Sequence, residues 1–447
     1  MMTLSGAFVN RSTHVERVHD KIKLMTEPLS TDPYKGVRDF YPADWARKDA
    51  IFATLRTTLR SWGYEEYNAS PLERAELYEA KTSEEIVGEQ TYTFMDRGDR
   101  RVTLRPEMTP TLARMVAAKR REMPFPLRWF SIPNVFRYER PQKGRLREHY
   151  QLNVDLVGVA GAEADFEVIM LAAELLKALG AKENDFIIRI NSRALLTAAC
   201  TAAGLESSAS RAYLRLLDKK SKMTPEEFDA ARGAITNAKD PLTLIEHSSE
   251  APEVAHEKRA LLDMIESLKM RGVGNAVFDP SLTRGFDYYT GVVFEIFDTN
   301  PANPRSLFGG GRFDKLVALF GGDPIPAIGF GMGDVTLADF LATHGLLPKD
   351  GNHTPQLYLG TPSVSDIPAA QAFAAALRKE GGRVFVNLSD RGLGDQIKDA
   401  VKRDIPLFIA YGANEVTSQT VRMKILRTGE EAGLPLSELP ARLRSGS

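Results

Sequence analysis

The sequence has little of several features that define common protein classes. It contains one cysteine, Cys200, which excludes an intramolecular disulfide framework and a zinc site built on cysteines. No apolar run approaches the roughly 20 residues that a membrane-spanning helix needs. The 58 Lys and Arg nearly equal the 59 Asp and Glu. The whole chain therefore has no basic excess for nucleic acid, which does not exclude a local basic groove.

The N-terminal end lacks the marks of a targeting signal. It has no apolar core followed by small residues, and it mixes acidic with basic side chains. We expect residues 1–30 to be a disordered or over-annotated extension. The proportions of apolar residues (43%) and charged residues (26%) are ordinary. The remaining chain is therefore expected to be a soluble, cytoplasmic protein of two or three domains.

Hydrophobic spacing predicts strands in the first half of the chain. Residues 126–132, 134–140 and 149–157 read as three successive strands, as in an antiparallel sheet. The third alternates strictly, which places Gln151 and Asp155 on one face.

The second half divides into regions of different texture. Residues 193–272 are rich in Ala, Leu, Lys and Glu and show no strand pattern, which predicts an all-helical insertion. A strand is predicted over 288–297. Residues 346–355 read as a linker, and the βαβαβ pattern that follows predicts a small, mostly parallel α/β domain over 356–447.

The first cluster with chemical meaning is a charged loop between two of the predicted strands. Five cations occur in eleven residues around a glycine, namely Arg137, Arg140, Lys143, Arg145 and Arg147. A solvated hairpin of mixed charge explains such a run. A clamp for polyphosphate or nucleic acid explains it as well, because the guanidinium fork matches phosphate oxygens.

Three other segments also have two interpretations each. Glu107 and Thr109 stand at a predicted helix start, where they either cap the helix or hold a substrate ammonium. The segment TRGFDYYTG (283–291) is either a strand end or the wall of a pocket for a polar planar group. The glycines 309–311 form either a turn or a surface that a ligand approaches closely.

Together these segments resemble one family, the histidyl-tRNA synthetases, which are class II aminoacyl-tRNA synthetases. The resemblance begins at KGVRDFYP (35–42) and extends into the C-terminal domain. FRYERPQKGRLREHYQLNVDLVG (136–158) is similar to motif 2, and TRGFDYYTG to the histidine-specific signature. Pro71 resembles the proline of motif 1, and GFGMG (329–333) stands where motif 3 is expected.

The resemblance implies an α+β fold and a reaction. An antiparallel-sheet catalytic domain over 31–345, interrupted by the helical insertion, would be followed by an anticodon-binding α/β domain. The implied enzyme is a homodimeric histidine–tRNA ligase with no membrane attachment. It would activate histidine with ATP and Mg²⁺ and charge tRNA(His). No protein ligand for a metal is assigned.

The resemblance also implies roles for single residues around histidine. Glu107, Met108 and Thr109 would surround the α-amino group. Gln151 and Asp155 would lie under the substrate, with Asp155 toward the imidazole. Tyr288 and Tyr289 would form the walls of the histidine pocket. Arg137 and Arg284 would face the reacting carboxylate.

For the nucleotide, Arg137 would bridge the histidine carboxylate and the α-phosphate, and Arg284 would face the same reacting pair. Glu139 and Arg145 would grip ATP. Gln142 and Lys143 would lie near the tRNA acceptor end.

Motif 3 departs from the family pattern. Thr336 stands where class II synthetases have an Arg that contacts adenine and the γ-phosphate. The sequence offers Arg145, Arg147 and Arg312 as replacements, and we favour Arg312 because it follows the glycine run.

Two other functions fit parts of the sequence. One is a non-catalytic, synthetase-like regulatory subunit of histidine biosynthesis, and the other is a tRNA-sensing domain of a regulatory protein. The presence of Arg137, Arg284, both tyrosines and a complete C-terminal domain favours the enzyme.

Overall fold

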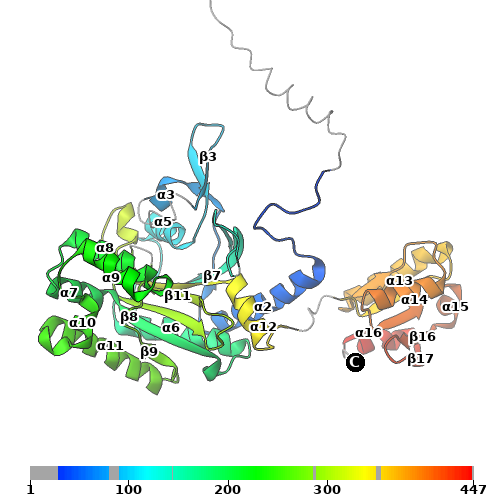
Figure 1. The fold of residues 1–447 in the computed structure, drawn as a ribbon. Coiled ribbons are helices and arrows are strands. Elements are labelled where there is room, and N and C mark those ends of the chain that lie inside the picture. The colour runs from blue at the N-terminus through cyan, green and yellow to red at the C-terminus, as the bar shows by residue number, and fades with distance from the viewer. Residues whose placement is uncertain (1–28, 80–89, 143, 285–287, 349–353, 445–447) are drawn as a thin grey trace, which may run out of the picture. The chain divides into compact units, whose positions relative to one another are not determined.

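The structure is a computed structural model that describes residues 29–79, 90–142, 144–284, 288–348 and 354–444 (Figure 1). Two compact units emerge from it. The second contains the described residues from Gly345 onward together with the short segments 40–58 and 178–180, and the first contains the rest. The extension predicted for residues 1–30 lies almost entirely outside the described residues.

A nine-stranded sheet forms the centre of the first unit. Its strands in spatial order are β1 (Glu65–Glu66), β5 (Leu127–Ser131), β7 (Glu148–Val157), β12 (Ala327–Gly333), β11 (Ser306–Arg312), β10 (Val292–Asp298), β8 (Phe186–Ser192) and β9 (Ala276–Phe278), and β6 (Asn134–Phe136) also pairs with β7. The strands from β5 to β8 pair antiparallel, whereas β1 and β9 pair in parallel at the edges. The predicted antiparallel core is confirmed.

A smaller sheet and several helices accompany these strands. The smaller sheet contains, in spatial order, β2 (Leu72–Arg74), β4 (Arg101–Leu104) and β3 (Tyr92–Met95). The helices that precede Gly345, outside the insertion, are α2 (Pro42–Ser61), α3 (Glu76–Glu79), α5 (Thr109–Lys119), α6 (Ala162–Ala178) and α12 (Asp334–Thr343). None of the described helices is both long and apolar enough to span a membrane.

The predicted helical insertion follows β8. Its α-helices are α7 (Arg193–Ala202), α8 (Ser207–Lys219), α9 (Pro225–Ile235), α10 (Pro241–Glu246) and α11 (Pro252–Met270). Local sequence sets several starts: Thr224 accepts a hydrogen bond from the Glu227 amide, and Asp240 from the Leu242 amide, each just before a proline. The insertion lies beside β8 and β9 at one end of the sheet (Figure 1).

The second unit contains a five-stranded sheet. Its strands in spatial order are β14 (Val384–Val386), β13 (Leu357–Gly360), β15 (Leu407–Ala410), β16 (Thr420–Ile425) and β17 (Glu431–Pro435). Its α-helices are α13 (Ile367–Lys379), α14 (Leu393–Lys402), α15 (Ala413–Ser418) and α16 (Leu439–Arg444). The βαβαβ prediction is confirmed, because β14, β13 and β15 are parallel. Leu357 and Tyr358 enter different core clusters, which shows that both faces of this sheet are covered.

Two local predictions need correction. The glycines 309–311 form no turn; they are the middle of β11, paired with both β10 and β12. A Cβ on Gly310 would overlap the Gly329 carbonyl oxygen, so glycine allows the two strands to approach here. The strand predicted over 288–297 begins later, at Val292. Tyr288 and Tyr289 precede β10 and line the site described below.

We predict that Gly310→Ala destabilises the first unit by about 3 kcal/mol or more, because the added carbon meets backbone that cannot rotate away. Gly161→Ala is the matched control, since a Cβ there meets no atom within 4 Å. Thermal denaturation of both variants tests this. Equal midpoints for the two variants would contradict it.

Candidate active site

The candidate site lies on a face of the large sheet where two neighbouring strands carry no side chains. Across β7, β12 and β11, Asn153 is opposite Gly331, which is opposite Gly309. The next row on the same face repeats this pattern, from Asp155 through two further glycines. Side chains two residues apart on a strand share a face. The missing side chains therefore leave an open floor.

A cavity of about 550 Å³, including its open mouth, lies on this floor. Its lining residues come from distant parts of the chain and are Glu107, Thr109, Arg137, Gln151, Asn153, Arg284, Tyr288, Tyr289, Gly309, Phe313, Gly329, Phe330 and Gly331. The structure thus brings together most of the residues that the sequence assigns to histidine. Met108 and Asp155 are not among the lining residues: the Met108 side chain is fully buried, and Asp155 is almost fully buried.

One wall carries a buried carboxylate. Glu107 lies just before α5, and its Oε2 accepts a hydrogen bond of 2.9 Å from the Tyr288 hydroxyl. Burial, and next the negative charge of Glu107, raise the pKa of Tyr288 well above its usual value, so this phenol stays neutral and donates. The Tyr288 ring packs on Tyr289 (centroids 4.9 Å apart) and Phe313 (6.0 Å). The carboxylate is thus held with a fixed orientation.

Arg284 supplies a positive charge close to the glycine floor. Its Nη1 lies 2.9 Å from Glu295 Oε1, and its guanidinium occupies the place that a Cβ on Gly309 would need. The guanidinium also lies over the Tyr289 ring, 5.8 Å from the centroid. Its Nε is buried and has no hydrogen-bond partner among the described residues. Arg284 is therefore anchored at one end and retains an unused donor.

Asp155 lies at the other end of the floor. Its carboxylate fills the place of the side chain that Gly329 lacks, and the residue is only 3% exposed. Burial raises the pKa of Asp155 to about 8. This carboxyl therefore holds its proton to a higher pH than an exposed Asp does. Gln151, from the same strand, packs over Gly331 in the same way.

The charged loop is a hairpin whose residues have separate positions. Arg137 lines the cavity and donates from Nε to the Pro106 carbonyl (2.9 Å). Glu139 and Arg145 form an ion pair of 3.0 Å outside the cavity lining.

At the tip of the hairpin, Gln142 pairs with Arg145 around Gly144, and its side-chain oxygen accepts a 3.1 Å hydrogen bond from Arg305. Lys143 lies outside the described residues.

Comparisons with known proteins agree with this geometry. The sequence model of histidyl-tRNA synthetase matches residues 36–335, and that of the anticodon binding domain matches 357–446. A histidine–tRNA ligase from Leptospira biflexa is 43% identical over 425 residues, which are 92% of this chain and 97% of that one. The chain belongs to the histidyl-tRNA synthetase family.

Solved structures show the same fold. Histidyl-tRNA synthetase from Nostoc sp. PCC 7120 matches with a TM-score of 0.74 and 23% identity, over 93% of this chain and 99% of that one. A structure from Bacillus halodurans, described as an ATP phosphoribosyltransferase regulatory subunit/histidyl-tRNA synthetase, matches with a TM-score of 0.64 and 24% identity. It covers 81% of this chain and 93% of that one. The expected class II synthetase fold is confirmed.

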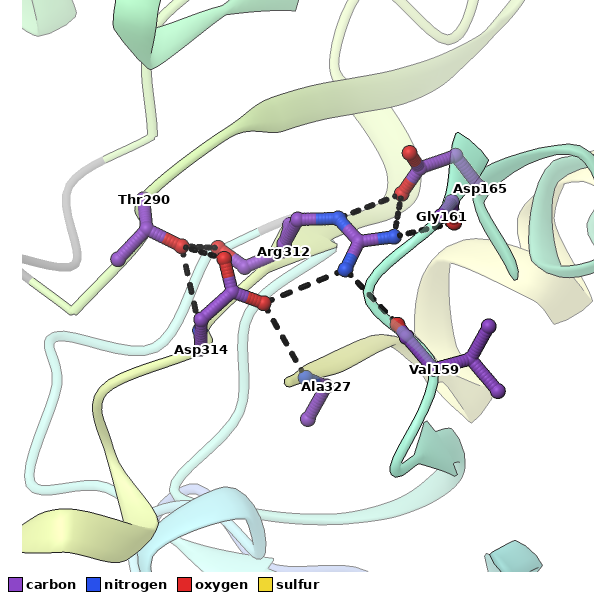
Figure 2. A network of polar contacts seen from close by, with 7 residues as sticks. All are labelled: Val159, Gly161, Asp165, Thr290, Arg312, Asp314 and Ala327. Atoms are coloured by element: carbon purple, nitrogen blue, oxygen red, sulfur yellow. Dashed lines mark hydrogen bonds and ion pairs between the residues drawn. The ribbon is translucent and has the colours of Figure 1, made fainter. Parts of the chain in front are cut away.

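The sequence favours Arg312 as the cation that replaces the motif 3 arginine, whose position Thr336 occupies. The structure places Arg312 away from the cavity. Arg312 follows Gly311, so its side chain leaves β11 on the face opposite the cavity. It forms a buried ion pair with Asp165 of α6 (Nη2 to Oδ1, 2.8 Å; each side chain 8% exposed) (Figure 2). Arg312 is therefore not available to ATP at this cavity.

The remaining donors of Arg312 are also used (Figure 2). Its Nη1 reaches the Val159 carbonyl (3.1 Å) and Asp314 (3.3 Å), and its Nη2 also reaches the Gly161 carbonyl (3.1 Å). Asp314 accepts a 2.9 Å hydrogen bond from Thr290, the residue after the two tyrosines. Arg312 thus links α6 to the segment that forms the cavity wall.

Thr336 contributes no cation but has a structural contact. Its hydroxyl donates to the Leu307 carbonyl (2.7 Å). It also lines a second, mainly apolar cavity of about 440 Å³ with Gly144 and Arg305.

The sequence interpretation missed Glu295, which holds Arg284. A signal for it exists, because Glu295 is an acid inside the apolar strand VVFEIF. The partner of such a residue cannot be read from the sequence, since it depends on which strand lies alongside.

We predict that Arg312→Ala lowers the free energy of unfolding by about 3–5 kcal/mol at pH 8, because it leaves the Asp165 charge buried without its partner. Burial raises the pKa of Asp165 to about 6 although Arg312 opposes this, so without Arg312 the carboxyl takes up a proton more readily. The deficit should therefore shrink as the pH falls to 5. Chemical denaturation at both pH values measures it.

The control is Arg271→Ala, which breaks the exposed ion pair with Glu163 in the first turn of the same helix. A change below about 1 kcal/mol is expected there. A selective rise in the ATP Michaelis constant of Arg312→Ala, without loss of stability, would restore Arg312 to the nucleotide site.

Proposed function

We propose that the chain is a histidine–tRNA ligase that forms histidyl-adenylate from histidine and ATP and then transfers the histidyl group to the 3′ end of tRNA(His). One observation carries the proposal: a single cavity collects Glu107, Arg137, Arg284 and a tyrosine pair from segments far apart in sequence. A carboxylate with two guanidinium groups suits a substrate that has an ammonium and a carboxylate and reacts with a phosphate.

The proposed binding of the amino acid follows the charges of the cavity. Glu107 and Thr109 take the α-ammonium, since Glu107 is already oriented by Tyr288. Arg137 takes the α-carboxylate, and Tyr289 forms a wall for the side chain. Gln151 lies below the substrate.

In the proposed reaction, a carboxylate oxygen of histidine attacks the α-phosphorus of ATP. The bond to the bridging oxygen breaks, and diphosphate leaves with that electron pair. Arg137 and Arg284 stabilise the negative charge that develops, and both are held by protein contacts before the substrates arrive. No protein base is required, because the carboxylate is ionised at neutral pH.

The proposed nucleotide and tRNA contacts extend along the hairpin. Glu139 and Arg145 hold ATP together with Arg137, and Mg²⁺ accompanies the triphosphate as part of the substrate. Gln142 and Lys143 serve the acceptor end of tRNA, and the C-terminal unit serves the anticodon.

We also propose a cytoplasmic homodimer. The three-stranded sheet exposes large apolar side chains, Leu72, Phe94 and Met95, which supports a partner surface there. The regulatory-subunit alternative is less favoured, because Arg137, Arg284 and the tyrosines line one cavity.

We predict that the purified protein exchanges labelled diphosphate into ATP with histidine and with none of the other 19 standard amino acids. The reason is that adenylate formation is reversible and the cavity offers polar partners for an imidazole. A parallel set of reactions, each with one amino acid and Mg²⁺, measures this. Exchange with another amino acid, or none with any, would contradict the proposed function.

A second prediction concerns pH. The carboxyl of Asp155 keeps its proton up to about pH 8. In the complex, this carboxyl and the neutral imidazole of histidine would form a buried pair that shares this one proton. Histidine affinity should therefore fall above pH 8, where the free site loses that proton. It should also fall below about 6.5, where free histidine gains one. The Michaelis constants for histidine and ATP, measured from pH 6 to 9, test this.

Asp155→Asn is the control for this profile. Its amide does not titrate, so the fall in affinity above pH 8 should be absent, while the profile for ATP should match that of the unmodified protein. An identical upper limb in both proteins would remove Asp155 from imidazole recognition.

A further inference from the structure

Two hydroxyl groups near Asp155 have unusual surroundings. The Tyr67 Oη and the Ser131 Oγ are both buried, and within the described part of the chain neither has a hydrogen-bond partner of good geometry, although the two hydroxyls lie close enough to interact with each other. Buried hydroxyls in folded proteins are nearly always hydrogen-bonded, because the loss of water around them costs free energy that a partner must offset. Two such groups in one place call for a ligand that completes them.

The sheet register places Ser131 beside the cavity. Ser131 of β5 is opposite Asn153 of β7, and Trp129 is opposite Asp155, so Ser131 lies on the same face as the glycine floor. Asn153 lines the cavity. Ser131 thus lies one strand beyond Asn153 in the row that forms the floor, and it is completely buried.

Tyr67 approaches the same place from the edge of the sheet. Its backbone amide donates to the Phe130 carbonyl (2.8 Å), which fixes it next to β5, and its ring packs on Trp129 (centroids 5.4 Å apart). Burial, and next the charge of Asp155, raise the pKa of Tyr67 well above its usual value, while hydrogen bonding with the Ser131 side chain lowers it. The phenol thus stays neutral, near both Asp155 and Ser131.

We propose that Tyr67 and Ser131 are specificity-determining residues whose hydroxyls, with the Asp155 carboxyl, recognise the polar nitrogens of the substrate's imidazole ring. This rests on the proposed function. Imidazole has one nitrogen that donates and one that accepts, and a hydroxyl can do either. An apolar ring of the same shape would leave the two hydroxyls unpaired, and sites of this kind reject such analogues strongly.

A purely structural role makes the opposite prediction. If the hydroxyls supported the fold, their removal would lower stability. If they await a ligand, Tyr67→Phe and Ser131→Ala remove an unpaired buried group, so the free protein should be as stable as before or more stable. Histidine binding should nevertheless weaken.

The experiment combines three measurements on the full chain and its variants. Thermal denaturation without substrates gives stability, diphosphate exchange gives the Michaelis constants for histidine and ATP, and calorimetry gives the dissociation constant for histidine. We expect each substitution to raise the histidine constants about tenfold, which corresponds to about 1.4 kcal/mol. The ATP constant should change by less than about twofold, because the proposal assigns these hydroxyls to the imidazole and not to the nucleotide.

Two controls sharpen the result. Tyr213→Phe removes a buried hydroxyl that donates to Asp240 (2.6 Å) in the helical insertion. It should lower stability and leave the histidine constants unchanged. Thienylalanine, which has a five-membered ring without nitrogen, should be rejected less strongly by Tyr67→Phe than by the unmodified protein.

Each outcome decides the proposal. Unchanged histidine constants in both variants overturn it, and so does a loss of stability with an equal rise of the histidine and ATP constants. If the unmodified protein neither binds histidine nor exchanges diphosphate with it, the proposed function fails and this proposal fails with it. If the unmodified protein binds histidine and exchanges diphosphate with it, and both variants have the same histidine constants as the unmodified protein, this proposal alone fails.

Discussion

The whole site depends on close packing of backbone at the centre of the large sheet. Gly310 on β11 allows β12 to approach, because any side chain there would overlap the Gly329 carbonyl. On the opposite face, Gly309, Gly329 and Gly331 leave the space that Arg284, Asp155 and Gln151 occupy from the sides. The floor of the cavity is thus hydrogen-bonded backbone, which has no side-chain rotamers to change.

Charges are arranged around this floor in two different ways. On the cavity face, Arg284 forms an ion pair with Glu295 and keeps one N–H donor without a partner among the described residues. Its guanidinium is therefore held in place and can still bind an anion. On the opposite face, Arg312 has an acceptor for every donor group and two carboxylates close by. Both residues are arginines of one sheet region, yet the first suits a substrate anion and the second only the fold.

Much of this arrangement follows from local sequence. The strict alternation of 149–157 places Gln151 and Asp155 on one face, and the motifs bring Glu107, Arg137 and Tyr288 to the same site. The structure places Arg312 away from the cavity, which the sequence could not reveal, because a glycine run alone does not show whether it is a turn or a strand, nor to which face the next residue points. Tyr67 and Ser131, the residues proposed for imidazole recognition, could not be singled out for a related reason, since β1 has only two residues and its partner β5 is distant in sequence. Register between distant strands is a property of the assembled sheet.

The helical insertion enters and leaves the large sheet at neighbouring strands. It departs from the end of β8, and β9, which follows it, pairs with β8 in parallel, with Ile188 opposite Ala276. The ends of the insertion are therefore fixed by the sheet, whatever lies between them. The insertion is nevertheless coupled to the cavity, because Asp218 of α8 accepts a 3.4 Å hydrogen bond from the hydroxyl of Thr283, the neighbour of Arg284.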